Sequence, residues 1–313
     1  MKNNPLVSVI MSTYNTEKKF LKSSIDSVLN QSYKNLELII VVDGGDDDIY
    51  INKFYNDDRI KIIKHNKNLG LPFSLNEAIK AAKGEFIARM DSDDISRKNR
   101  IAKQVEYMNN NSHVDILSTW YKTIGTSSKL VREKNMKSKY AMSKLFFVNI
   151  IAHPSVMFRR KSIFNKNLFY NEKFKYSQDF ELWNRNNNVI IEILPYIGIY
   201  YRVHNNQVST SKKNEQEKFY RFTLTRNLEK LCINPCNIDF LLILNGRKKS
   251  KDYKKVYNFI IDALNNNLKL KMYDFYAFDL VLKKQYIIYS IKNKQLLNKY
   301  FFKNLIYVFK RRK

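Results

Sequence analysis

Three aspartates, Asp91, Asp93 and Asp94, stand directly after the short stretch FIARM, which begins at Phe86. Such a mostly apolar run is typical of a strand that is covered on both faces of a sheet. Ligands of open α/β sheets bind beyond the carboxyl ends of the strands, so these carboxylates are expected to line a crevice. Asp91 and Asp93 can both present oxygens to one hard cation, Mg²⁺ or Mn²⁺, and that cation could bridge phosphates.

A simpler interpretation of the same aspartates is structural. Asp93 or Asp94 could cap a helix that begins near Arg97, because Asp is a preferred N-cap residue, or the cluster could be a solvated loop. Asp94 is the stronger candidate for the cap. Short motifs give false positives, so the rest of the chain must decide between the two interpretations.

Length and composition indicate a globular enzyme-sized chain. The 313 residues, 44% of them hydrophobic, suffice for one large catalytic domain and an appendage. Cys232 and Cys236 have no histidine near them in sequence, so neither a disulfide framework nor a zinc site is indicated, and buried or half-buried thiols in a reducing compartment are expected. The apolar stretch near the start is too short for a signal peptide, and no run approaches a transmembrane span. These features predict a cytoplasmic protein without an integral anchor.

The formal net charge of +27 is concentrated in the last third of the chain, where residues 206–313 hold 24 Lys and Arg against 8 Asp and Glu. A basic surface favours acidic partners such as nucleic acid, anionic lipid or a phosphorylated substrate. A general compositional drift towards Lys, Asn, Ile and Tyr is the alternative explanation.

Apolar periodicity predicts alternating strands and helices over the first hundred residues. Strands are expected at 7–12, 37–42, 59–64 and 86–90. Helices are expected at 18–30 and 46–57, and a third helix has Pro72 in its first turn and Gly84 as its C-terminal cap. This order is typical of a parallel, doubly wound sheet. The polar tips 13–15, 43–45 and 91–94 then meet at one edge and form a nucleotide crevice.

Later segments extend the pattern less regularly. A helix is expected at 97–110, a strand at 114–121, a short strand at 153–158, and a helix from Gln178 in which Asp179 lies in the first turn.

The order of these elements and their tips resembles the family 2 inverting glycosyltransferases of the GT-A fold, over about residues 5–205. The resemblance implies an α/β fold, a GT-A (Rossmann-like) mostly parallel sheet flanked by helices, with a C-terminal mainly helical extension. It divides the chain into a catalytic domain, 1–206, and a basic, mainly helical C-terminal region, 207–313.

Donor-binding positions follow from the resemblance. PLVSVIMSTYN matches the first strand of the family, which assigns Thr13 and Tyr14 to the donor, and Asp43 matches the aspartate that accepts from uracil. Val42 replaces an aspartate that usually precedes it. The remaining positions match the Asn-x-Gly motif and weaker family features: Asn68, Gly70, Arg100 and His204.

Chemistry also follows from the resemblance. DSDD matches the Asp-x-Asp motif, so Asp93, assisted by Asp91, is expected to hold Mn²⁺ or Mg²⁺ and the donor diphosphate. Asp179, preceded by Gln178 where the family usually has Glu, is expected to take the proton from the acceptor hydroxyl. One displacement inverts the anomeric carbon. A UDP-sugar donor and a glycan or lipid-linked acceptor of surface polysaccharide synthesis are implied.

Several side chains keep two interpretations. Arg89 and Arg100 contact phosphate or pair with carboxylates. His153 lies near the acceptor or is structural, and Trp183 forms an acceptor wall or, as its helical spacing from Phe180 favours, belongs to the core.

The C-terminal region has no catalytic motif. Its clearest amphipathic segment is 295–310, where Leu and aromatic residues face one way and lysines the other. Such a helix could lie on an anionic membrane at the inner face of the cell membrane, or pack on the catalytic domain or a second subunit.

Two other functions compete. A sugar nucleotidyltransferase should carry a Gly-rich basic loop after the first strand, but MSTYNTEKK has no glycine. A nucleic-acid-binding protein would suit the charge, yet no recognition motif is present and no nucleic acid partner is expected.

Overall fold

A computed structural model describes residues 4–133, 137–204, 207, 212–250 and 252–293. The chain forms two compact units. The first, here called the sheet unit, comprises residues up to 136, 151–182 and 188–216. The second, the helical unit, comprises 137–150, 183–187 and the residues from 217 onward. The domain boundary at 206/207 stays a prediction.

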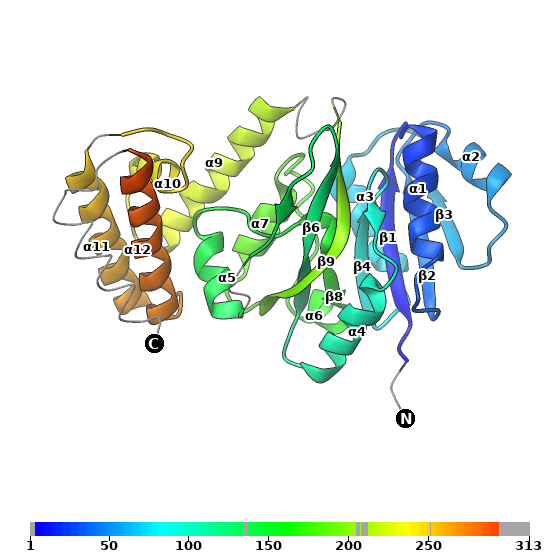
Figure 1. Ribbon diagram of the computed structural model, residues 1–313, viewed down its shortest axis with the longest axis horizontal. Coiled ribbons are helices and arrows are strands. Elements are labelled where there is room, and N and C mark those ends of the chain that lie inside the picture. Colours follow the sequence, from blue (N-terminus) through cyan, green and yellow to red (C-terminus); the bar gives the residue numbers. More distant parts are fainter. Residues whose placement is uncertain (1–3, 134–136, 205–206, 208–211, 251, 294–313) are drawn as a thin grey trace. The chain divides into compact units, whose positions relative to one another are not determined.

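The sheet unit contains one mixed sheet, in which the strands of the described residues follow the order β3-β2-β1-β4-β8-β6-β9-β5 (Figure 1). Four parallel strands form one half: β1 (Val7–Thr13), β2 (Leu36–Val42), β3 (Ile60–Lys64) and β4 (Phe86–Asp91). The other strands are β5 (Ile95–Ser96), β6 (Ile116–Gly125), β7 (Leu130–Val131), β8 (Met157–Arg159) and β9 (Ile191–Val203). This arrangement confirms the predicted α/β class and the first four predicted strands.

Burial explains why the parallel strands read as apolar runs. All seven residues of β2 are buried, because helices cover both faces of the strand. Four helices belong to this half: α1 (Lys18–Leu29), α2 (Asp47–Phe54), α3 (Leu71–Ala81) and α4 (Arg100–Asn110). The apolar faces of α1 and α4 join one core with the inward residues of β1, β2 and β4, while α3 packs against β1 and β2.

Register brings the polar strand tips together. Thr13 lies beside Val42, and Ser12 lies beside Asp91. The tips of three parallel strands therefore meet at one edge of the sheet, as the sequence predicts, and the acidic residues after β4 lie at that edge.

Gly84 does not cap α3, contrary to the prediction. The helix ends at Ala81 with Ala82 as its C-cap. A Cβ on Gly84 would lie 2.5 Å from the backbone nitrogen of Ser8 and 2.8 Å from the carbonyl oxygen of Phe86. Glycine is thus needed here because β1 approaches the chain closely just before β4 begins.

The remaining elements of the sheet unit are short. They are η1 (His153–Ser155), α6 (Arg160–Asn165) and α7 (Gln178–Arg185), whose last residues belong to the helical unit.

The helical unit contains α5 (Ser138–Leu145), η2 (Pro235–Asn237), α10 (Ile238–Leu244), α11 (Tyr253–Leu270), α12 (Phe275–Lys292) and most of α9 (Lys213–Lys230). Its core includes an aromatic cluster in which the ring of Phe146 lies 4.9 Å from Phe147 and 5.2 Å from Phe278. This confirms the mainly helical C-terminal region. The segment 295–310 lies outside the described residues.

Two further expectations concern this unit. Cys232 and Cys236 are exposed, whereas burial was expected, because Cys232 lies in a turn after α9 where Leu231 and Ile233 take the buried positions. Within the described residues, no helix has the length and apolar character that a membrane crossing requires.

Candidate active site

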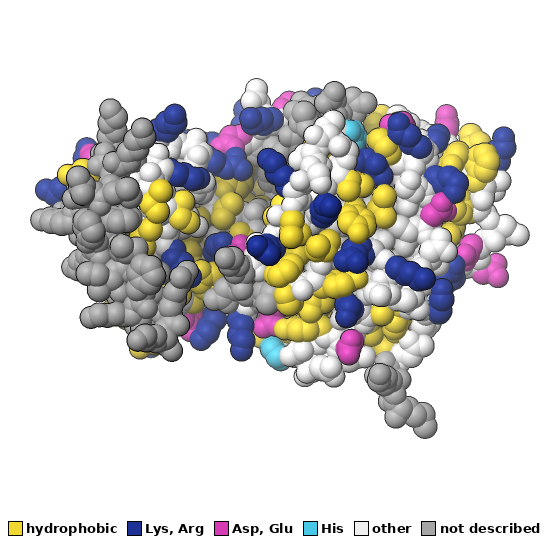
Figure 2. Space-filling model, in the orientation of Figure 1, with side chains coloured by type: hydrophobic (Ala, Val, Ile, Leu, Met, Phe, Trp, Pro, Cys, Tyr) yellow, Lys and Arg dark blue, Asp and Glu magenta, His cyan; other side chains and the backbone are white. Residues whose placement is uncertain are grey.

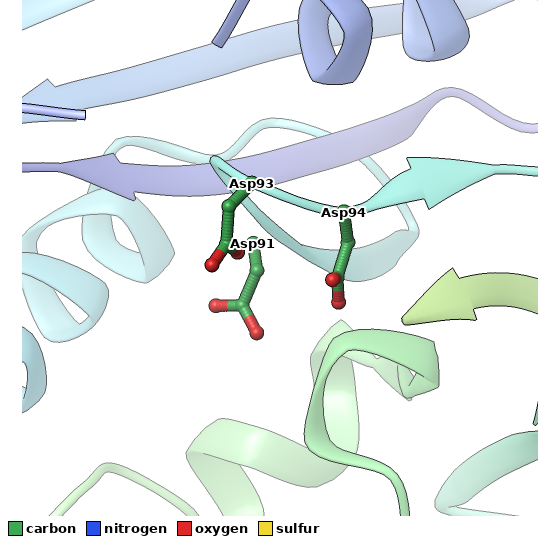
Figure 3. Close-up of side chains that lie close together, drawn as sticks. All are labelled: Asp91, Asp93 and Asp94. Carbon is green, nitrogen blue, oxygen red and sulfur yellow. The ribbon is translucent and has the colours of Figure 1, made fainter. Parts of the chain in front are cut away.

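The site is built around the acidic loop, defined as Asp91, Asp93 and Asp94 after β4. One carboxylate oxygen from each lies within 4.8 Å of the others, and the three side chains point to the same side of the loop (Figure 3). Helix α1 anchors this loop, because the Ser24 hydroxyl donates to the Asp91 carbonyl oxygen at 2.7 Å. The sequence motif therefore does bring three carboxylate groups together.

Asp94 is part of this cluster and caps no helix, contrary to the prediction. Helix α4 begins only at Arg100. Asp94 is fully buried, and its Oδ1 accepts from the Arg202 backbone N–H at 2.7 Å. Its Oδ2 has no hydrogen-bond partner in the described structure. Burial, and after it the charges of Asp91 and Asp93, raise the pKa of Asp94 well above its ordinary value.

Asp91 is held by a buried arginine on its own strand. Arg89 is 3% exposed, its Nη1 donates to Asp91 Oδ2 at 2.6 Å, and its Nη2 pairs with Oδ1. Burial raises the pKa of Asp91 to about 6 although Arg89 opposes the rise, and the charges of Asp93 and Asp179 add to it. Of the two roles considered for Arg89, the structure shows the carboxylate pair.

The end of β9 covers the other side of the acidic loop. His204 Nε2 lies 3.0 Å from Asp93 Oδ2, and Arg202 Nε donates to the Asp93 carbonyl oxygen at 2.7 Å. The Arg202 guanidinium also lies over the ring of Phe20, 4.3 Å from its centroid. His204 is therefore placed at the site, where its imidazole reaches a carboxylate of the acidic loop.

Asp179 approaches the acidic loop from helix α7. Ser177, with a left-handed φ of 52°, precedes the helix, and Asp179 is the second helical residue and half-buried. Its charge contributes to the raised pKa values of Asp91 and Tyr170, so its carboxylate lies within electrostatic range of both. The structure brings the predicted base and the acidic loop together.

The tip of β2 serves as a clamp for the loop before α3. Asp43 is 2% exposed, and its carboxylate accepts from the backbone N–H groups of Leu69 (2.8 Å) and Gly70 (2.9 Å) and contacts His65 Nδ1 at 2.8 Å. These contacts hold the segment that carries Asn68, whose side chain is exposed. Asp43 thus shapes the loop around the predicted base-binding position.

At the tip of β1, the two predicted donor residues differ in accessibility. Thr13 is 2% exposed and its hydroxyl donates to Asp47 Oδ2 at 2.6 Å. Tyr14 is 53% exposed and is open to a ligand. The Thr16 and Ser92 hydroxyls lie 2.8 Å apart and link this tip to the acidic loop.

Comparison with known proteins decides the family. Glycosyl transferase family 2 matches residues 8–168, about half of the chain. The chain belongs to this family. It is therefore a glycosyltransferase, and the alternatives of a nucleotidyltransferase and a nucleic-acid-binding protein are set aside.

Relatives of this glycosyltransferase cover most of its length. An uncharacterized glycosyltransferase, MJ1057 of Methanocaldococcus jannaschii, is 35% identical over 74% of this chain and 83% of its own. The O-antigen biosynthesis glycosyltransferase WbnJ of Escherichia coli is 35% identical over 66% of this chain and 83% of its own. The fold resembles that of S. aureus TarS residues 1–349, solved with UDP-GlcNAc, with a TM-score of 0.60 and 17% identity over 93% of each chain. The GT-A fold is thereby confirmed.

The acidic loop of this glycosyltransferase fits a divalent cation. Carboxylate oxygens are the ligands that Mg²⁺ and Mn²⁺ prefer. Asp94 Oδ2, buried without a hydrogen-bond partner in the part of the chain that the structure describes, is an oxygen that such an ion would satisfy. Asp94 thus lies beside Asp91 and Asp93, the two ligands that the sequence predicts.

Arg100 does not reach the donor side of the site, contrary to the prediction. It is fully buried behind the acidic loop, where its guanidinium donates to Gln104 Oε1 at 2.9 Å and to the carbonyl oxygens of Arg89 (2.8 Å) and Val156 (3.2 Å). These bonds join α4, β4 and the start of β8, so Arg100 supports the loop from within the core.

Two more side chains are settled by burial. His153 is 9% exposed and its Nε2 lies 2.7 Å from the hydroxyl of Tyr170, which fits its structural interpretation. Burial, with Arg89 adding to it, holds the pKa of His153 well below its ordinary value, so the imidazole is neutral. Trp183 is 1% exposed and belongs to the core, as its spacing favours.

Sequence reasoning missed His65. Its Nδ1 contacts Asp43 and its Nε2 contacts Glu77 on α3. Burial disfavours the imidazolium, but hydrogen bonds to Asp43 and Glu77 outweigh it and raise the pKa of His65. Nothing in the sequence spacing signals this, since Asp43 and His65 are 22 positions apart.

Proposed function

We propose that this protein is a metal-dependent, inverting glycosyltransferase that moves a sugar from a UDP-sugar to a glycan or lipid-linked acceptor in surface polysaccharide synthesis. One observation carries the proposal: a cluster of three carboxylates lies at the sheet edge, and the half-buried carboxylate of Asp179 lies within electrostatic range of it. This arrangement provides separate groups for holding a diphosphate and for taking a proton.

The names of similar proteins support the donor and acceptor classes. TarS has been solved with UDP and with UDP-GlcNAc. WbnJ is an O-antigen enzyme, and WfaP of Escherichia coli, 33% identical over 67% of this chain, is a UDP-Glc:alpha-D-GlcNAc-diphosphoundecaprenol beta-1,3-glucosyltransferase. A lipid-linked acceptor would place the enzyme at the cytoplasmic face of the cell membrane.

Donor binding is assigned to the strand tips. Asp91, Asp93 and Asp94 would hold Mg²⁺ or Mn²⁺, and a bound ion would neutralise charge on the leaving diphosphate. Arg89 fixes the orientation of the Asp91 carboxylate through two contacts. Tyr14 packs on the nucleoside, since its ring is the exposed group at the tip of β1.

Base recognition is assigned to the loop that Asp43 holds. The Asp43 carboxylate orients Asn68 and Gly70 through the backbone of that loop and accepts from uracil with an oxygen lone pair that remains. Thr13, buried against Asp47, fixes the end of β1 from which Tyr14 projects.

Proton transfer is assigned to Asp179. Its carboxylate accepts the proton of the acceptor hydroxyl while the hydroxyl oxygen attacks the anomeric carbon from the face opposite the diphosphate. Gln178 is neutral where the family usually has a carboxylate, so Asp179 is the one acid of this pair. His204, at Asp93, completes the wall of the site on the β9 side.

A nucleotide-sugar screen tests this function. Nucleoside diphosphate release should occur with a UDP-sugar and acceptor in the presence of Mn²⁺ or Mg²⁺, and chelation should abolish it. Asp93→Asn should weaken donor binding, whereas Asp179→Asn should lower turnover by about 100-fold or more with donor binding kept. Asp58→Asn, on the surface before β3, is the matched control.

Three outcomes would contradict parts of the proposal. Full turnover by Asp179→Asn would remove that residue as the base. A product that retains the anomeric configuration would exclude the single displacement. Unchanged activity after complete metal removal would exclude the role given to the acidic loop.

A further inference from the structure

We propose that the outer face of β6 and β9 in the sheet unit is a docking surface for an anionic lipid bilayer. This inference goes beyond the transfer reaction, and the choice of lipid as the partner rests in part on the lipid-linked acceptor of the proposed function. The surface, here called the outer patch, combines aromatic and aliphatic side chains with arginines and lysines. Its members are Trp120, Ile124, Leu130, Tyr196, Tyr200, Arg97, Lys103, Lys122, Arg132 and Arg202.

Strand register places Lys122, Ile124, Leu130, Tyr200 and Arg202 on one face. Tyr200 on β9 pairs directly with Lys122 on β6, and Lys122 pairs with Leu130 on β7. Directly paired residues point to the same side of a sheet, and residues two apart along a strand do so as well. Ile124 therefore lies on that side with Lys122, and the Trp120 indole N–H donates to the carbonyl oxygen of Glu133, which follows β7, at 3.0 Å. Figure 2 shows yellow side chains over β6 and β9 with Lys and Arg side chains among and around them.

Cations lie directly against the aromatic rings of the outer patch. The Arg97 guanidinium is 5.2 Å from the ring centroid of Tyr196 and 5.9 Å from that of Tyr200, and Lys103 Nζ is 5.4 Å from Tyr196. Arg97 is fixed in place, since its backbone N–H donates to the Gly198 carbonyl oxygen at 2.9 Å. Such side chains combine an apolar body with a charged or polar tip, which suits a membrane interface.

The charge of the outer patch is not neutralised by neighbours. None of Arg97, Lys103, Lys122 and Arg132 forms an ion pair with a residue in the described ranges. No Asp or Glu is among the members of the patch. The patch thus complements an anionic surface, and Leu130, 46% exposed, offers an aliphatic group to its outer layer.

Continuity with the active site favours lipid over other polyanions. Tyr200, Arg202 and His204 alternate along β9, and Arg202 and His204 contact Asp93. A bilayer seated on the outer patch would hold its headgroups next to the acidic loop, where a membrane-borne acceptor must present its hydroxyl. An exposed aliphatic group, Leu130, among aromatic and basic side chains suits a bilayer better than a nucleic acid.

A site-specific reporter tests the contact in the full-length protein. Leu130→Trp should shift its emission to the blue and be quenched by brominated lipid in phosphatidylcholine vesicles that contain phosphatidylglycerol. Ile49→Trp is the matched control, because Ile49 is 62% exposed on the same unit but stands among Asp46, Asp47 and Asp48. Its added signal should not change.

A charge series tests the attraction. Replacing Lys103, Lys122 and Arg132 with Gln should lower the vesicle partition coefficient by about 100-fold, since each basic group near the surface contributes about five-fold. The control triple replaces Lys34, Lys80 and Lys83, which are exposed elsewhere on the sheet unit, with the same change in net charge. It should lower partition by much less.

Several results would overturn the proposal. They are absence of vesicle binding, binding without quenching of Leu130→Trp, and equal losses in the two charge triples. A response of Leu130→Trp to a soluble acidic oligosaccharide but not to vesicles would assign the patch to a glycan instead. Transfer to a soluble acceptor is measured separately, so failure of the docking surface and failure of the proposed reaction are distinguishable.

Discussion

Replacing Arg89 with Met tests whether the buried pair with Asp91 supports the acidic loop. Methionine has a similar length and suits the apolar surroundings of β4, so the change removes the charge and two hydrogen bonds and leaves little void. The Arg89 side chain is 3% exposed and that of Asp91 is 27% exposed. The variant therefore leaves a largely buried carboxylate without its counter-charge.

The size of the effect follows from this burial. Breaking a fully buried ion pair by removing one partner costs about 3–5 kcal/mol. Water reaches part of the Asp91 carboxylate, and the variant also removes Arg89 Nε, which is buried without a hydrogen-bond partner in the described structure. Both facts reduce the loss, so we expect the free energy of unfolding to fall by about 2 kcal/mol at neutral pH.

The loss should depend on pH in a defined direction. The pKa of Asp91 in the folded protein is about 6, above the ordinary value of 3.8, and removal of Arg89 raises it further. A carboxyl group whose pKa is raised by folding destabilises the folded state at pH values above its folded-state pKa. This loss of stability disappears as the pH falls from the folded-state pKa towards the lower pKa of the unfolded chain. The cost of Arg89→Met should therefore shrink between about pH 7 and about pH 5.

Urea unfolding followed by circular dichroism measures the effect. Arg59→Met is the matched control, because Arg59 pairs with Asp57 at 2.7 Å but is itself 31% exposed, so water screens this pair and its contribution is at most about 1 kcal/mol. Arg89→Lys, which keeps the charge, should recover part of the loss. An Arg89→Met loss no larger than that of Arg59→Met, or one that grows on acidification, would refute the reasoning.

Three further predictions address other parts of the site. Gly84→Ala should destabilise the protein by about 2 kcal/mol or more in urea unfolding, because the new Cβ meets backbone atoms that cannot move independently. Asp94→Asn should leave the fold intact by circular dichroism but weaken Mn²⁺ binding, read by electron paramagnetic resonance, by about 10-fold or more. His65→Gln should cost more stability near about pH 6 than near about pH 9, because Asp43 and Glu77 raise the pKa of His65 in the folded protein. A histidine whose pKa is raised by folding stabilises the folded state only at pH values below that pKa. A constant difference in stability across that range would contradict the assignment.

The sequence alone determined the parallel half of the sheet and the place of the acidic loop. Strands buried on both faces require continuous apolar residues, so β1, β2 and β4 are visible as runs, and the polar residue that follows each run marks its tip. Periodicity identified α1 and α4, and separated motifs identified the family. Local chemistry decides all of these features, because a strand or helix depends mostly on its own residue types.

The tertiary structure decided what each polar side chain touches. Asp94 looks like a helix cap in sequence, yet its partner is the backbone of Arg202, 108 positions away. Arg100 looks like a phosphate ligand, yet its guanidinium donates to the carbonyl oxygens of Arg89 on β4 and of Val156 just before β8. Gly84 looks like a cap, yet the approach of β1 requires it. These roles depend on contacts between distant segments, which spacing along one chain does not specify.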